Sequence, residues 1–132
     1  MTIELKMLVL VSVLSIVMWL PYILARIQAY GYLKTLTYSV DESPLPDWAI
    51  RAKKAHYNAV ENLVVFSILI IVAHLAQISN DGTVYAAIGY FWFRVAHYVL
   101  YISGIPFGRT IAFTGAWLAQ ICIAYQILAM TF

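Results

Sequence analysis

Three polar side chains lie where the sequence turns from charged to apolar. Lys54, Asn58 and Glu61 are spaced i, i+4, i+7, and the chain continues without Pro or Gly into the apolar run 63–73. At about 100° per residue, these side chains fall within an arc of about 60° on one helix face. A carboxylate that enters an apolar membrane helix is costly unless a partner pairs with it. The chemistry of this chain therefore depends on what faces Glu61.

A second polar face supplies candidate partners. Arg94, His97 and Tyr101 are spaced i, i+3, i+7 and fall within a similar arc. An unpaired arginine at membrane depth costs about 2.5 kcal/mol or more. The simplest arrangement places the two faces opposite each other, with Glu61 accepting from Arg94 or from another basic group. The alternative is a buried ion pair that only fixes helix register.

Cations exceed carboxylates around these two faces. The cations are Arg51, Lys53, Lys54, Arg94 and Arg109. Together with Asn, Tyr and His donors, this surplus suits an anionic, hydrogen-bonding small molecule. The sequence predicts no metal site, because no set of His, Cys, Asp and Glu has ligand spacing on one face. It also predicts no nucleic-acid partner, because the net charge is only +2 and there is no Lys/Arg-rich tract.

The elements that would position these side chains are membrane helices. The 132 residues are 64% hydrophobic and 11% charged, against about 25% charged in soluble domains. We expect a single all-α domain over residues 1–132, an integral membrane four-helix bundle. Its apolar segments cover about 5–30, 48–77, 84–103 and 111–130.

The loops predict how the chain is oriented. Residues 31–47 are predicted to form an exposed loop with Asp47 as the N-cap of the next helix, and 104–110 are predicted to form the last turn, which contains Arg109. Most Lys and Arg residues flank the first and third loops, so the positive-inside rule places these loops in the cytoplasm. With four spans, both termini then lie on the non-cytoplasmic side. If the protein is bacterial, the membrane is the inner membrane. Arg26 ends the first span as either a snorkelling anchor or a ligand that faces the bundle.

Two of these runs resemble a known family. Residues 51–63, with Asn58 and Glu61, resemble the second-helix pattern of the MAPEG family, the membrane-associated proteins in eicosanoid and glutathione metabolism. The run from Arg94 to Tyr101, followed by Arg109-Thr110, resembles the third helix and the following loop. The pattern is most similar to that of the microsomal prostaglandin E synthases and glutathione transferases.

The resemblance implies a homotrimer that binds glutathione between subunits near the cytoplasmic side. Arg109 would stabilise the glutathione thiolate and Thr110 would assist it. The residues that would contact or surround glutathione, together with the accompanying cations, are Arg26, Arg51, Lys54, Asn58, Glu61, Arg94, His97 and Tyr101. Phe113 stands where several members have a tyrosine near the thiol.

The implied activity is that of a transferase or peroxidase in the membrane. Glutathione would add to a lipophilic small-molecule electrophile or reduce a lipid hydroperoxide, with the substrate arriving from the surrounding membrane lipid. The alternative is a non-catalytic lipid-binding or scaffold protein of the same fold.

Overall fold

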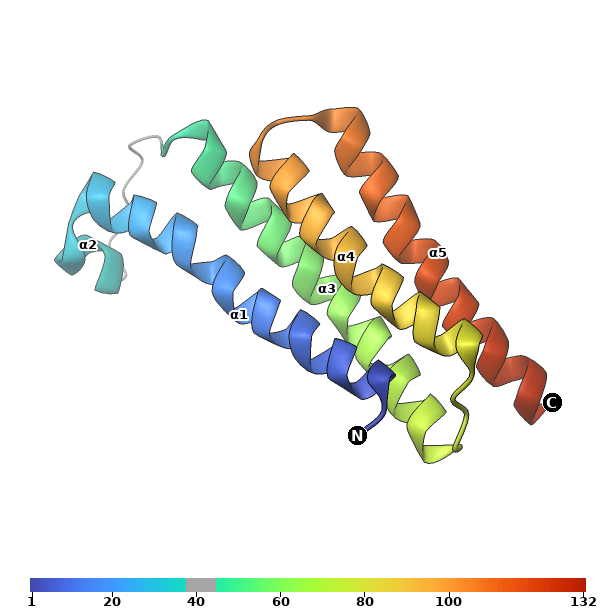
Figure 1. Cartoon of the computed structure of the whole chain (residues 1–132). Helices are drawn as coiled ribbons and strands as arrows, with labels where there is room; N and C mark the ends of the chain where they lie inside the picture. Colours follow the sequence, from blue (N-terminus) through green and yellow to red (C-terminus); the bar gives the residue numbers. More distant parts are fainter. Residues whose placement is uncertain (38–44) are drawn as a thin grey trace.

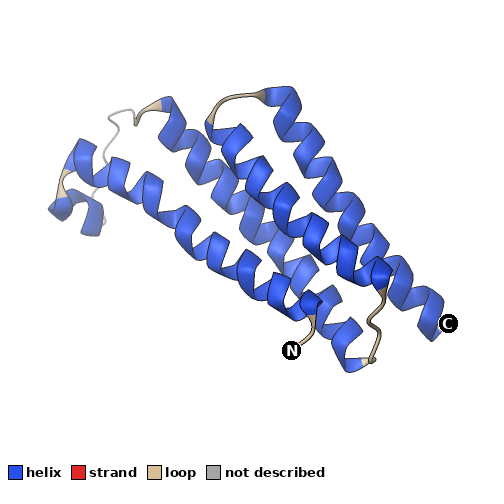
Figure 2. Ribbon diagram, in the orientation of Figure 1, coloured by secondary structure: helices blue, strands red, loops and turns tan. Residues whose placement is uncertain are grey.

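The computed structural model describes residues 1–37 and 45–132, and every regular element in this part of the chain is a helix (Figures 1 and 2). The helices are α1 (Ile3–Tyr30), α2 (Tyr32–Leu36), α3 (Asp47–Leu75), α4 (Asp81–Ile102) and α5 (Pro106–Thr131). The all-α fold expected from the sequence is therefore observed.

The four long helices lie side by side, with the short α2 at one end (Figure 1). α4 packs most extensively on α5 and also contacts α1 and α3, whereas α1 packs on α3 and α4. The two termini and the α3–α4 turn lie at one end of the molecule, and the α4–α5 turn lies at the other. Polar groups from the first half of α3, the last half of α4 and the start of α5 are thus brought to the same end.

Three helices are long and apolar enough to cross a membrane, namely α1, α3 and α5. α4 has 22 residues and, at 1.5 Å per residue, is about 33 Å long. It carries Asp81, Arg94 and His97, and two of these side chains are buried inside the chain. The structure therefore describes a membrane protein with three candidate spans and a fourth long helix packed among them.

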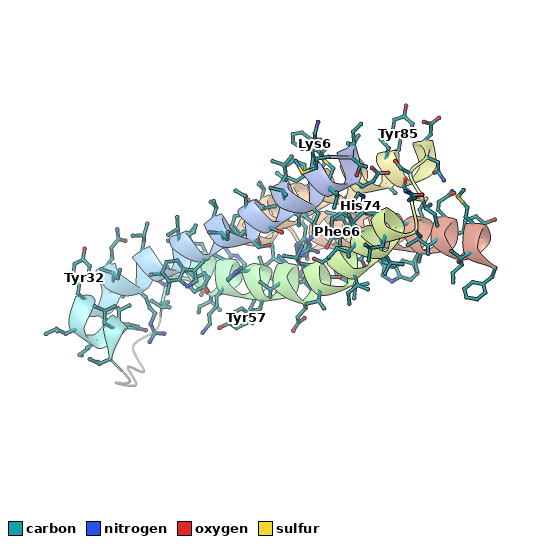
Figure 3. All side chains as sticks on the ribbon, turned by 90° about the horizontal axis from the view of Figure 1, so that it is seen from below. Lys6, Tyr32, Tyr57, Phe66, His74 and Tyr85 are labelled. Carbon is teal, nitrogen blue, oxygen red and sulfur yellow. The ribbon has the colours of Figure 1, made fainter. Side chains whose placement is uncertain are left out.

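Small residues allow the helices to approach closely. Ala49, Ala52, Ala55 and Ala59 recur every three or four residues of α3 and are almost fully buried. Small side chains at this spacing let membrane helices pack backbone against backbone. Further along α3, the Phe66 ring stacks on Tyr90 of α4 with a centroid distance of 3.9 Å. This face of α3 is the centre of the core, whereas Tyr57 projects outward from α3 (Figure 3).

Two helix ends have the same hydrogen-bond pattern. At the end of α3, the N–H of Gln77 donates to the carbonyl of His74 and the N–H of Ile78 to that of Ala73. Gly104, with the left-handed φ of 75°, takes the equivalent place after α4, where the N–H of Gly104 donates to the carbonyl of Tyr101 and the N–H of Ile105 to that of Leu100. This is the Schellman motif, which requires a left-handed residue directly after the cap. Glycine meets that requirement after α4, but Gln77 adopts φ 57° after α3.

The boundaries differ from expectation at two loops. Asp47 is the first residue of α3 and not its N-cap, since Pro46 holds the cap position without a side-chain bond. Of the segment expected to be a loop, Tyr32–Leu36 is helical, and residues 38–44 lie outside the described part of the chain. α5 begins at Pro106, because proline is well suited to the first turn of a helix. Arg109 is therefore on a helix and not in a loop.

Candidate functional site

A pocket of about 260 Å³ opens where α3, α4 and α5 meet near the α4–α5 turn. Its lining comes from α3 (Asn58), α4 (His97, Tyr101) and α5 (Arg109, Thr110, Phe113). The sharp reversal at Gly104 positions the last turns of α4 against the first turns of α5. Five of the predicted site residues therefore share one cavity, and Phe113, which the sequence comparison placed near the thiol, completes it.

Arg109 is held at this pocket by an aromatic ring. Its guanidinium carbon lies 4.5 Å from the centroid of the Tyr101 ring. A cation in this position is attracted to the negative face of the ring, by about 0.5–1 kcal/mol at an exposed site. Arg109 remains partly exposed, so its N–H groups are available to an anion in the pocket.

Arg94 lies behind the pocket and positions Asn58. It is 2% exposed, and its Nη2 donates to Asn58 Oδ1 at 2.9 Å. Its Nε and Nη1 have no hydrogen-bond partner within residues 1–37 and 45–132. A buried cation therefore depends on one neutral acceptor, and the amide orientation of Asn58 is fixed with its NH₂ group directed away from Arg94.

His97 forms the inner wall of the pocket. It is also 2% exposed, and its ring meets Tyr101 edge-on with a centroid distance of 5.4 Å. Phe113 lies on another side of the imidazole at 6.1 Å. His97 Nδ1 has no partner among the described residues. The imidazole is thus packed in place and retains an unused polar atom.

Thr110 is partly committed to its own helix. Its hydroxyl donates to the Pro106 carbonyl at 3.0 Å, one turn earlier. The hydroxyl oxygen can still accept a hydrogen bond in the pocket.

The expected pairing of Glu61 with Arg94 is wrong within this chain. Asn58 is the acceptor for Arg94, and Glu61 is exposed on a different surface, beside His56, Tyr57 and Val60. Lys54, Asn58 and Glu61 share an arc of about 60° on α3. This arc is wide enough that Asn58 faces the interior of the bundle while Glu61 lies on the exposed surface. Lys54 is exposed as well.

The other two predicted ligands lie away from this pocket. Arg51 Nε donates to the Ile102 carbonyl at 2.9 Å and so braces the end of α4. Arg26 lies over the Tyr30 ring at 5.4 Å and lines a separate pocket of about 260 Å³ between α1 and α3, which also includes Lys53. Neither guanidinium lines the pocket of Asn58 and Arg109.

Two polar clusters were not identified from the sequence. The Tyr22 hydroxyl and His56 Nδ1 are 3.0 Å apart between α1 and α3. At the other end of the molecule, Glu4 is 3% exposed and is bonded to Ser79 and Thr83. A lone acid at the start of an apolar helix was the available signal for Glu4. No group of three or more potential metal ligands occurs in the described residues.

The comparisons with known proteins agree with the sequence patterns. Residues 7–129 match the model of the MAPEG family. This range covers nearly the whole chain, including all of α3 and α4 and most of α1 and α5. No curated protein and no solved structure matched the chain.

Proposed function

Because the chain belongs to the MAPEG family, we propose that it is a glutathione-dependent transferase or peroxidase acting on lipophilic electrophiles or lipid hydroperoxides. The observation that carries this proposal is the pocket in which Arg109 lies over Tyr101. It combines a partly exposed cation with amide, imidazole and hydroxyl groups at the end of a membrane bundle. These groups are suited to binding an anionic thiol beside the lipid phase.

The donors of the pocket fit glutathione. Asn58 would bind the peptide backbone, and Tyr101 would hold a polar group of glutathione. Arg94 does not line the pocket, so its direct contact with glutathione requires the side chain to turn from its place behind Asn58. The buried Nε and Nη1 of Arg94, which have no partner in the described part of the chain, fit an anionic ligand. When bound, glutathione supplies the thiol that forms the new bond to the electrophile. Arg109 favours the ionised sulfur because a nearby cation lowers a thiol pKa.

The size of the pocket favours a site shared between subunits. Its 260 Å³ lies below the range of about 300–1,000 Å³ usual for small-molecule sites. Glu61 and Lys54 are exposed in the single chain, where a neighbour could use them. We propose that a homotrimer completes the site, with Glu61 binding the amino group of glutathione and with Arg26, Arg51 and Lys54 as its outer cations.

The same proposal gives α4 a place in the membrane. α4 would be the fourth span, with its polar residues shielded by neighbouring helices. Buried charges in a membrane helix face the bundle interior in this way. With four spans, both termini would lie on the non-cytoplasmic side and the pocket on the cytoplasmic side.

The test is the substitution Arg109→Ala. We expect it to reduce turnover with a generic electrophile or hydroperoxide by about 10²-fold, the usual cost of removing one preorganised donor. Its effect on glutathione affinity should be under threefold, since the other donors remain. Lys6→Ala is the matched control, because Lys6 is an exposed cation at the opposite end of the molecule (Figure 3). Unchanged turnover in Arg109→Ala would exclude the thiolate role.

A second function is favoured by an apolar groove. Ser12, Ile16, Trp19 and Leu63 are among the residues that line a cavity of about 480 Å³ between α1 and α3. A non-catalytic lipid-binding protein would hold an acyl chain there. That alternative predicts a lipid that copurifies with the protein and no thermal stabilisation by glutathione.

A further inference from the structure

A second pocket, of about 410 Å³, lies at the end of the molecule opposite to the Arg109 pocket. It is formed between the first turn of α1 and the end of α3, and residues 77–79 of the α3–α4 turn also line it. Its polar lining residues are Thr2, Glu4, His74, Gln77 and Ser79. None of these residues takes part in the proposed glutathione chemistry.

Glu4 is the buried carboxylate of this pocket. Its Oε1 accepts from Ser79 Oγ at 2.8 Å and from Thr83 Oγ1 at 2.6 Å. These bonds hold the start of α1 against the start of α4. Glu4 Oε2 is buried too, and it has no hydrogen-bond partner among the described residues. A buried carboxylate oxygen without a donor is costly, so Oε2 would gain from a donor that the hydrogen bonds of the described residues do not supply.

The surroundings of Glu4 favour a cation as that partner. The residues that line the pocket include no Lys or Arg, and Glu4 is their one acid. The lining also includes Ala73, His74 and Leu75 from the last turn of α3. The C-terminal end of a helix carries partial negative charge and stabilises cations. The carboxylate and this helix end therefore add their negative potentials in one cavity.

A donor with several N–H groups fits better than a metal ion. Hard cations such as Ca²⁺ bind six to eight oxygen ligands, often from several carboxylates. This pocket offers a single carboxylate, and no metal-binding group of three occurs in the described residues. An ammonium group carries three N–H donors, and the Gln77 amide oxygen and nearby hydroxyls are further acceptors.

We propose that this pocket binds a primary ammonium group, with Glu4 Oε2 as its charged acceptor. The ammonium has two sources in a membrane, a free small amine or the head group of an ethanolamine phospholipid. Both present the same R–NH₃⁺ group to Glu4. A quaternary ammonium has no N–H and should not replace it.

The first experiment compares amines on the detergent-solubilised full chain. Methylammonium and ethanolamine should each raise the melting temperature by a few degrees at saturation, whereas tetramethylammonium chloride at equal ionic strength should not. Equal responses to all three salts would overturn the proposal. The two sources are distinguished in nanodiscs. A higher melting temperature in ethanolamine lipid than in choline lipid would identify the lipid head group as the source of the ammonium. A higher melting temperature only after addition of a free amine would identify the free amine.

The variants locate the effect at Glu4. Glu4→Gln keeps an oxygen acceptor for Ser79 and Thr83 but removes the charge, and it should weaken ethanolamine binding about tenfold or more. Asp81→Asn is the matched control, because Asp81 is an exposed acid in the first turn of the adjacent α4. An equal loss of affinity in both variants would refute the assignment to Glu4.

A measurement on the unmodified protein covers the case in which Glu4→Gln does not fold. Dicyclohexylcarbodiimide modifies carboxyl groups in apolar surroundings, and peptide mass mapping would report its addition at Glu4. The readout is the loss of the unmodified Glu4 peptide, which counts both the dicyclohexyl adduct and the amide that ethanolamine forms with an activated carboxyl. Ethanolamine should slow this loss, and tetramethylammonium should not. A failure of ethanolamine to protect would overturn the proposal, and none of these outcomes depends on glutathione.

Discussion

The bond between Arg94 and Asn58 allows a sharp test of what keeps a buried arginine stable in this fold. Arg94 is 2% exposed and its Nη2 donates to Asn58 Oδ1 at 2.9 Å, while Nε and Nη1 have no partner in the described part of the chain. Asn58→Leu keeps a similar side-chain size and removes this acceptor. Arg94 would then retain its charge without any hydrogen bond to the described residues.

The expected cost follows from that isolation. A hydrogen bond to a charged group contributes about 1.5–3 kcal/mol, and an unpaired arginine at membrane depth costs about 2.5 kcal/mol or more. We therefore expect Asn58→Leu to lower the free energy of unfolding by about 2–4 kcal/mol. Arg94→Met removes the charge as well as the bond, and replacing a buried ion by an apolar side chain is often nearly neutral.

The double variant separates this reasoning from a simple packing effect. In Asn58→Leu/Arg94→Met the buried charge of residue 94 is gone, so the stability of this variant should be close to that of Arg94→Met alone. The coupling energy should equal the cost of Asn58→Leu, about 2–4 kcal/mol, measured from denaturant unfolding of the four proteins in one detergent without glutathione. Additive losses, with a coupling below about 0.5 kcal/mol, would show that Asn58 does not stabilise Arg94.

The helix ends and the core give two further predictions. Gln77→Gly should raise the free energy of unfolding by about 0.5–1 kcal/mol, because Gln77 has φ 57°, a conformation that glycine adopts without strain. Gly104→Ala should lower the free energy of unfolding by about 1 kcal/mol, because Gly104 has φ 75°. A change of the same sign for both variants in thermal melts would contradict the helix-end assignment. Phe66→Ala should cost about 3–5 kcal/mol, because Phe66 is fully buried and stacks on Tyr90. Phe66→Leu, which retains most of the volume, should cost less than half as much in the same denaturant titration.

The patterns that predicted the fold are those that depend on neighbouring turns of one helix. Long apolar runs indicated the helices, and the spacing of His97 and Tyr101 placed them on one face, where the structure has them in one pocket. The start of α5 was predicted five residues late because Gly104 and Pro106 were both taken as turn residues. In the structure only Gly104 makes the turn, while Pro106 occupies the first position of the helix, where its missing N–H has no cost.

Contacts between distant segments were less predictable. The arc shared by Asn58 and Glu61 covers about 60°, and the sequence does not show where the edge of the buried surface falls within it. The structure places that edge between the two residues. Glu4 was missed for a related reason, since its partners Ser79 and Thr83 are more than seventy residues away along the chain.

The different environments of Arg94 and Glu61 have a consequence for the proposed enzyme. Arg94 is buried, and two of its nitrogen atoms have no acceptor among the described residues, whereas Glu61 is exposed and has no ion-pair partner in the described structure. A bundle built only for stability would gain by pairing the two charges or by replacing Arg94 with an apolar residue. A site for a zwitterionic ligand requires both Arg94 and Glu61, unpaired with each other, because the carboxylate and the ammonium group of the ligand each need a separate partner. Glutathione has both groups, which is why this separation supports glutathione over a purely anionic thiol.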